Sequence, residues 1–363
     1  MNKYIECRAY RQGKIRIVVL ILVVLMLKPA VSTAQDVPAF VYYNNLSAQA
    51  GFPKELQSKR SVVVMDVGDD WRELSEEVHE KLRLMSVDAV QYIDYRDLVA
   101  GEDATKAILE YLDKRDISFI LTFGRNDQNQ YELNITEMKD FLKPGPQLSY
   151  RYSNVKIDGL LKFMANELIK ADLQKSNFLI AEGPEFLEDA AAIEGRKFEV
   201  HARDLATLKL AVPKFSKVSI EAVNSTVNKA AIEDYNRKVD NWNIELEAIL
   251  KAEFPYKFEL VETTDAAALY KDGSQYALFS FHTKGVTIKK MLNMKTGDAE
   301  TAYITTTANG ELKRQSVTKP VWKFYVKHLY TNDIYTGDKW DADETWQQSL
   351  RNYLFHYRRF VGV

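Results

Sequence analysis

The sequence predicts an α/β fold of two mixed-sheet domains followed by a carboxy-terminal helix. Short runs rich in β-branched residues alternate with longer segments whose apolar residues recur every three or four positions, which is typical of layered strands and helices. The element order that begins at Ser58 then recurs from Ser216. A duplication would produce this recurrence, but any second α/β domain could also produce it, so both explanations stay open.

These patterns divide the chain into six parts. They are a signal peptide (1–34), a linker (35–57), a first α/β domain (58–174), a connector (175–215), a second α/β domain (216–332), and a loop with a terminal helix (333–363). The connector is charged and is interrupted by Pro184, Gly195 and Pro213. Breaks of this kind are typical of a domain boundary.

The first domain is expected to alternate strands with amphipathic helices. Strands are predicted at 61–67, 89–94, 117–123 and 131–138, and helices at 71–85, 103–114 and 155–171. The helix at 71–85 shows the period most clearly, because Trp71, Val78 and Leu82 fall on one face. Asp69 or Asp70 is placed to cap it.

The second domain is expected to repeat this order. Strands are predicted at 218–223, 257–262 and 276–281, a strand pair at 288–293 and 301–307, and helices at 228–253, 265–271 and 320–329. The terminal helix contains the apolar residues Trp346, Leu350 and Leu354 at helical spacing. Asp343 is expected to cap this last helix.

The amino terminus predicts export from the cytoplasm. A basic leader that includes Lys3, Arg8 and Arg11 precedes an uninterrupted apolar run at 17–27, and small residues at 32–34 follow. This arrangement predicts a secretory signal peptide cleaved near Ala34, because the apolar run is shorter than the roughly 20 residues that span a bilayer. The protein is therefore expected in the periplasm or outside the cell, with a retained amino-terminal anchor as the alternative.

Composition excludes several classes of chemistry for the exported chain. Cys7, the single cysteine, lies in the predicted signal peptide. Disulfides, cysteine nucleophiles and thiolate metal sites are then excluded. The first 34 residues carry six of the 49 basic and one of the 51 acidic side chains, so the remainder has a formal net charge of −7. This acidity and the scattered basic residues argue against nucleic acid or an anionic membrane as partner.

Four segments of the first domain together resemble a known family of envelope domains. They are the strands at 61–67, 117–124 and 131–136 and the helix around 78–85. Their order resembles the amino-terminal domain of TolB-type periplasmic proteins. The resemblance implies an envelope interaction domain without a catalytic site of its own.

The candidate site residues lie in the second half of the chain. Asp338, Asp341 and Asp343 offer oxygen ligands that suit calcium, although a capped, solvated turn would use the same residues. Trp340 lies in the same polar loop and could stack on a ligand such as a sugar. His282 follows the predicted strand at 276–281, where ligand sites of α/β folds often lie, although a histidine at a strand end more often has a structural role.

Function is predicted from an export signal combined with the lack of catalytic motifs. The sequence contains no GxGxxG or Walker loop, no HExxH and no GxSxG. We therefore expect a non-catalytic binding module of the cell envelope or secreted fraction, which needs no cofactor and binds an envelope protein or surface component. The alternative is an extracytoplasmic hydrolase with its site in the cleft between the domains.

Overall fold

The structure is a computed structural model that describes residues 46–49, 52–126, 128–140, 147–187, 193–217, 226–297 and 299–363. The predicted signal peptide, its cleavage position and part of the linker lie outside these ranges. The described residues all belong to one compact unit, Asp36–Val363. No helix within them combines the length and the apolar character that crossing a membrane requires.

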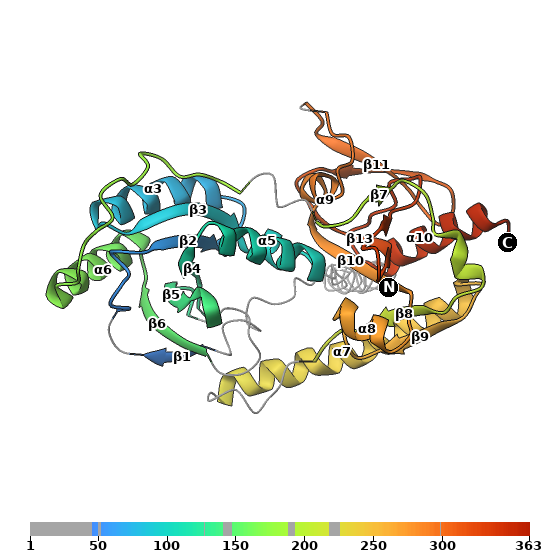
Figure 1. Cartoon of the computed structure of the whole chain (residues 1–363), viewed down its shortest axis with the longest axis horizontal. Coiled ribbons are helices and arrows are strands. Elements are labelled where there is room, and N and C mark those ends of the chain that lie inside the picture. The colour runs from blue at the N-terminus through green and yellow to red at the C-terminus, as the bar shows by residue number, and fades with distance from the viewer. Residues whose placement is uncertain are drawn as a thin grey trace, which may run out of the picture. The chain divides into compact units, whose positions relative to one another are not determined.

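The first half of the chain forms a mixed six-stranded sheet (Figure 1). Its strands are β1 (Leu46–Gln49), β2 (Arg60–Met65), β3 (Asp88–Asp94), β4 (Ile117–Arg125), β5 (Tyr131–Glu137) and β6 (Gln147–Asn154). The spatial order is β1-β6-β5-β4-β2-β3. β2 runs parallel to β3 and β4, whereas β5 runs antiparallel to β4 and β6. The apolar run of β2 is buried throughout because helices cover both faces of the sheet.

Two pairs of helices cover this first sheet. α3 (Trp71–Leu84) and α6 (Ile157–Ala171) pack on one face, and α4 (Tyr95–Leu98) and α5 (Glu102–Lys114) pack on the other. A 3₁₀ turn, Met138–Asp140, follows β5. The buried residues of α3 include Trp71, Val78 and Leu82. The helical periodicity in the sequence therefore predicted the buried face correctly.

The second half forms another six-stranded mixed sheet. Its strands are β7 (Lys197–Phe198), β8 (Leu210–Pro213), β9 (Phe258–Val261), β10 (Tyr276–Lys284), β13 (Pro320–His328) and β14 (Ile334–Tyr335), in the order β7-β14-β13-β10-β8-β9. When β8 is set against β2, strand order and direction agree with the first sheet at every pair. The recurrence predicted from the sequence is thus a recurrence of complete sheet connectivity.

Helices cover the second sheet in the corresponding way. α7 (Thr226–Glu253) and α10 (Trp346–Val361) pack on one face, as α3 and α6 do in the first domain. α8 (Ala266–Lys271) and α9 (Gly285–Met291) lie on the other face, and a short 3₁₀ helix, Arg203–Ala206, precedes β8. α9 and a hairpin of β11 (Ala302–Thr306) and β12 (Leu312–Ser316) stand where the first domain has only a tight turn.

The segment 320–329 was predicted as a helix and is the strand β13. Its apolar residues recur at helical spacing because Lys323 and Lys327 interrupt them in the manner of a polar helix face. Both lysines are buried and each pairs with an aspartate outside β13, Lys323 with Asp341 and Lys327 with Asp103. Local periodicity could not reveal these partners.

Three smaller predictions for the second domain are not matched by the described elements. The predicted strand at 288–293 belongs to α9 and the turn after it, and β11 pairs with β12 instead. The predicted strand at 218–223 lies outside the described residues, and β8 occupies the place expected for it in the sheet. α10 is capped by Thr345, whose hydroxyl accepts a hydrogen bond from the backbone N–H of Gln348, and not by Asp343.

Candidate functional site

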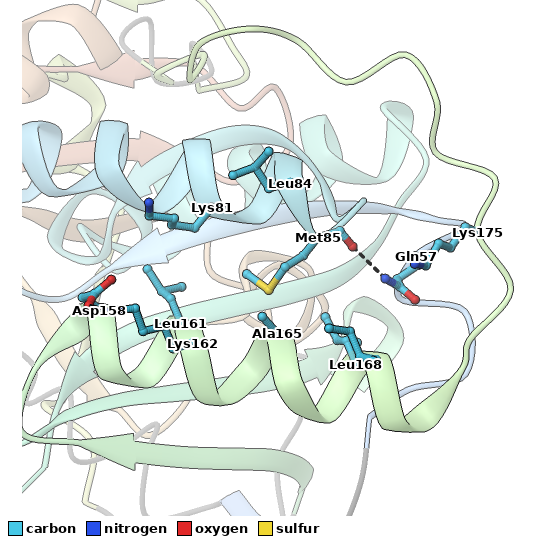
Figure 2. Close-up of a pocket in the computed structure, with 11 residues that line it drawn as sticks. Gln57, Lys81, Leu84, Met85, Asp158, Leu161, Lys162, Ala165, Leu168 and Lys175 are labelled. Atoms are coloured by element: carbon cyan, nitrogen blue, oxygen red, sulfur yellow. Dashed lines mark hydrogen bonds and ion pairs between the residues drawn. The ribbon is translucent and has the colours of Figure 1, made fainter.

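An open groove lies between α3 and α6 on the first domain. Figure 2 shows Met85, which follows the last residue of α3, pointing toward Ala165 and Leu168 of α6; Leu84 of α3 and Leu161 of α6 also line the groove. These side chains line a cavity of about 270 Å³. Its lining is therefore predominantly apolar, which is characteristic of a binding surface.

Two large apolar side chains at the groove are exposed to solvent. Leu84 is 69% exposed and Ile169 is 72% exposed. α6 buries its stripe of Leu160, Leu161, Met164 and Leu168 against the sheet, and Ile169 falls outside that stripe. Both side chains border the groove, so their apolar surface is accessible to a partner that binds there.

The rim of the groove is basic. Lys81, Lys162 and Lys175 border it, together with a single carboxylate, Asp158. Lys162 Nζ lies 2.7 Å from Asp158 Oδ2, and this hydrogen bond lowers the pKa of Asp158. The rim thus has an excess of positive charge on a chain whose net charge is negative.

One buried polar atom also belongs to the groove. Gln57 is 2% exposed, and its Nε2 donates a 2.7 Å hydrogen bond to the Met85 carbonyl, as Figure 2 shows. This bond places Oε1 on the other side of the amide, where it has no partner among the described residues. Oε1 is itself closed off from solvent, so the Gln57 amide fixes this end of the groove and does not offer an acceptor to a ligand.

The equivalent helices of the second domain are linked by polar side chains. α7 and α10 are bridged by an ion pair between Glu253 and Arg351. Gln347 Nε2 also donates a 2.8 Å hydrogen bond to Glu245 Oε2.

A network of charged side chains joins the two domains. Asp94, at the end of β3, accepts hydrogen bonds from Arg96 Nη2 at 2.9 Å and from Lys284 Nζ at 3.1 Å. Thr283 Oγ1 donates a 2.5 Å hydrogen bond to Asp97. Burial raises the pKa of Asp97, and the nearby carboxylate of Asp94 adds to the shift. The network sits at the carboxyl end of β3 and connects it to β10.

A second contact between the domains involves the start of α5. Asp103 accepts hydrogen bonds from Tyr325 Oη at 2.6 Å and from Lys327 Nζ at 2.5 Å. Gly101 lies so close to β10 that an added Cβ would stand 2.5 Å from the Ser280 carbonyl oxygen. Only glycine permits this approach of the backbones.

His282 borders a separate cavity of about 280 Å³ at this junction. Its ring stacks on Trp322 with centroids 4.3 Å apart, and its backbone N–H donates a 2.7 Å hydrogen bond to the Ala100 carbonyl. The residue is 7% exposed, and burial, helped by Arg96, lowers its pKa to about 4. The structure therefore places this predicted residue in a cavity wall.

The three predicted calcium ligands lie apart and face different lysines. Asp341 is fully buried 2.7 Å from Lys323, Asp343 is buried 3.0 Å from Lys313, and the more exposed Asp338 lies 3.7 Å from Lys339. Within the described ranges, no three His, Cys, Asp or Glu side chains gather closely enough to hold a metal ion. Calcium binding by these three residues stays a prediction.

Trp340, the predicted stacking residue, is half-buried. Its ring meets Tyr303 edge-on with centroids 5.6 Å apart, and Lys289 Nζ lies 5.3 Å from its centroid. The ring is thus packed on the β11–β12 hairpin and on α9. Ligand binding by Trp340 stays a prediction.

The groove residues were missed by sequence reasoning. Leu84 and Ile169 offered a signal, because both are large apolar residues next to, and not on, the stripe of an amphipathic helix. Gln57 offered none, since it lies in the predicted linker. The contact between α3 and α6 also depends on residues about 80 positions apart.

Comparison of the chain with protein-family models, with characterised proteins and with solved structures gives no match.

Proposed function

We propose that the chain is an exported binding module of the cell envelope, and that the α3–α6 groove of its first domain binds a segment of another envelope protein. The basic leader and apolar run of the first 34 residues support export. The observation that carries the proposal is the groove itself, with its apolar floor, exposed edges and lysine rim. The resemblance of the first domain to TolB-type amino-terminal domains is a further argument for an interaction role.

The chemistry of the groove indicates which segment would bind. Apolar side chains spaced along one face of a helix or extended segment would cover Leu84, Met85 and Ile169, which is a recurring mode of peptide recognition. Acidic residues beside them would meet Lys81 and Lys175. The partner is therefore an amphipathic segment with Asp or Glu flanking its apolar residues.

The open edges of the groove support this occupant over an enclosed metabolite. The exposed edges formed by Leu84 and Ile169 extend the apolar surface beyond the cavity. A segment that inserts a small number of side chains and rests on these edges uses both features.

Hydrolysis, the alternative function, would centre on the cavity that His282 borders. A general base needs a partner that orients its ring and a neighbouring nucleophile or water. The ring of His282 is held by stacking on Trp322, and its Nε2 has no hydrogen-bond partner among the described residues. This geometry favours a binding role over catalysis.

Site-specific photocrosslinking in cells tests the proposal. A photoreactive residue at Leu84 or Ile169 should capture the same envelope protein, and the captured segment should combine apolar residues with Asp or Glu. The matched control is Leu312, which is 73% exposed on the β12 strand of the second domain. Equal capture from position 312, or no capture from either groove position, would contradict the proposal.

Charge reversal tests the role of the lysine rim. Lys81→Glu combined with Lys175→Glu should weaken capture at position 169 and should remove its sensitivity to salt, because screening acts on the attraction between the rim and the acidic flanks. Lys106→Glu is the control, since Lys106 is exposed on α5, away from the groove. Unchanged capture by the double variant would show that the rim does not contribute.

A further inference from the structure

The strands β3 and β9 hold equivalent places, since each stands at the end of its sheet and runs parallel to the strand beside it. An extended part of the connector covers the edge of β3. The Tyr92 backbone N–H donates a 2.8 Å hydrogen bond to the Glu185 carbonyl, and the Leu187 N–H donates a 3.0 Å hydrogen bond to the Tyr92 carbonyl. The connector thus adds one short parallel strand to the first sheet.

A single aromatic side chain anchors this added strand. Phe186 lies on the face of the sheet that α3 covers, with its ring edge-on to Trp71 and the two centroids 5.3 Å apart. Its centroid lies 6.3 Å from that of Tyr92. Backbone hydrogen bonds and one apolar side chain therefore hold the segment, which is how a sheet edge binds an added peptide strand.

The edge of β9 has no such cover in the described part of the chain. The carbonyls of Lys257 and Val261 accept hydrogen bonds of 3.0 and 2.9 Å from β8 and the residue after it, so alternate residues of β9 face β8. The N–H and C=O groups of Phe258 and Leu260 point to the other side, where no backbone group of the described residues bonds to them. An uncovered edge strand is a template for pairing with another chain.

The exposure of the two strands agrees with this difference. No residue of β9 is buried, whereas most residues of β3 are buried. The Leu260 side chain packs on the core that α7 covers, while its backbone groups point to the open edge. Leu260 therefore stands in its sheet as Tyr92 stands in the first sheet.

An open hollow of about 820 Å³ lies between α7 and the end of β9. Leu260, Phe215 and Ile244 contribute apolar surface to it, and Ile244 of α7 is 67% exposed. The hollow thus offers a place for an apolar side chain beside Leu260, as Trp71 and Tyr92 do for Phe186.

Four charged side chains at the hollow form two ion pairs. Lys214 pairs with Glu262, and Lys217 Nζ lies 2.6 Å from Asp240 Oδ1. The charges around the hollow are therefore balanced, which favours an uncharged side chain as its occupant.

We propose that the open edge of β9 binds an extended segment of another protein, which adds as a parallel strand and places one large apolar side chain against Leu260 and Ile244. The occupant follows from the chain's own example at β3, where residues 185–187 bind in this way. The site lies on the second domain, is separate from the α3–α6 groove and goes beyond the function proposed for that groove.

Hydrogen exchange of the full chain, followed residue by residue by NMR, tests whether the edge is open. The amides of Glu259 and Val261 face β8 and should be protected, whereas those of Phe258 and Leu260 should exchange quickly. Protection of Leu260 in the absence of a partner, whether by this chain or by a second copy, would overturn the proposal.

A capped peptide with the sequence of residues 182–189 is the probe for the edge, because its central residues already bind the equivalent edge of the first domain. Saturation with this peptide should protect the Leu260 amide. Replacing Phe186 by Ser in the peptide should weaken binding about tenfold, since no apolar side chain then enters the hollow. Fluorescence polarisation of the labelled peptides measures both affinities.

A substitution in the protein tests the hollow. Because Ile244 is exposed, Ile244→Glu should fold and should bind the peptide about tenfold more weakly. Ile304→Glu, at a 52% exposed position on β11, is the matched control and should keep the natural affinity. Lack of saturable binding, equal affinities for the two peptides, or equal affinities of the two variants would each overturn the proposal.

Discussion

The second domain contains a buried ion pair between Lys323 and Asp341. Lys323 is fully buried, and its Nζ donates hydrogen bonds to the Phe324 carbonyl at 2.9 Å and the Thr336 carbonyl at 2.7 Å while it pairs with Asp341. Burial raises the pKa of Asp341, and Lys323 opposes that shift. A buried ion pair is tolerated when further hydrogen bonds satisfy its members, as they do for this lysine.

The pH dependence of stability should report on His201. Its ring packs among Tyr353, Tyr357 and Phe360, and burial, with repulsion from Lys323, lowers its pKa to about 3. The unfolded chain takes up the proton near pH 6.5 and the folded chain does not. Stability contributed by the neutral ring is thus present above pH 6.5 and is lost as the pH falls toward 3.

His201→Phe removes this titration and keeps an aromatic ring. Between pH 7 and pH 5, the unfolding free energy of the natural protein should fall by about 2 kcal/mol more than that of the variant. Urea unfolding at the two pH values measures the difference. Identical losses in both proteins would show that His201 does not control the pH dependence.

Asp103 should contribute strongly to stability. Its carboxylate is the partner of the buried side chains Tyr325 and Lys327. Asp103→Asn leaves the lysine charge without a counter-ion and should cost about 3 kcal/mol of unfolding free energy. Asp113→Asn, on the exposed face of the same helix, is the matched control and should change the value by less than about 0.5 kcal/mol.

At the scale of secondary-structure elements, the two domains share one sheet connectivity but differ in their helices. The helix pair α3 and α6 leaves a groove, whereas the pair α7 and α10 is bridged by Glu253 and Arg351. The connection from β10 to β13 also carries α9 and the β11–β12 hairpin, in place of the turn between β4 and β5. Differences between the domains therefore lie in helix surfaces and in two connections, because α4 and α5 join β3 to β4 whereas α8 joins β9 to β10, while the sheets are alike in strand order and direction.

The turn between α4 and α5 should be intolerant of a side chain. Gly101→Ala would place a Cβ 2.5 Å from the Ser280 carbonyl oxygen, so the two backbones would have to move apart. We expect a loss of about 1–3 kcal/mol in unfolding free energy, measured by urea denaturation. Gly183→Ala is the control, because an added Cβ there meets nothing within 4 Å. Equal stability of the two variants would contradict the packing seen at the junction.

For the whole molecule, the junction connects two sheets that each have their own core. Asp94 and Asp103 bond to residues of the second domain, and Ala100 and Ala104 pack into the core that includes Phe279. Buried polar and apolar contacts of this kind couple the unfolding of neighbouring domains.

Calorimetry should therefore show one cooperative transition for the natural protein. Combining Asp94→Asn with Asp103→Asn removes both charged anchors and should separate this transition into two, one for each domain. Two transitions already present in the natural protein would show that the junction does not couple them. A single transition retained by the double variant would place the coupling in the apolar contacts alone.

The sequence by itself determined the α/β class, the alternation of elements from 60 to 137, the helix that ends at Ala171 and the terminal helix, because the spacing of apolar residues along a helix or strand is a local property. It did not predict strand β6. Only the tertiary structure decided that 320–328 is a strand. In the sequence, Lys323 and Lys327 have the spacing of a polar helix face, and only the fold pairs them with Asp341 and Asp103. The same holds for the candidate sites. The groove at Leu84 and Ile169 and the cavity at His282 are each assembled from segments distant in the chain, and pairing between distant segments leaves no periodic trace in the sequence.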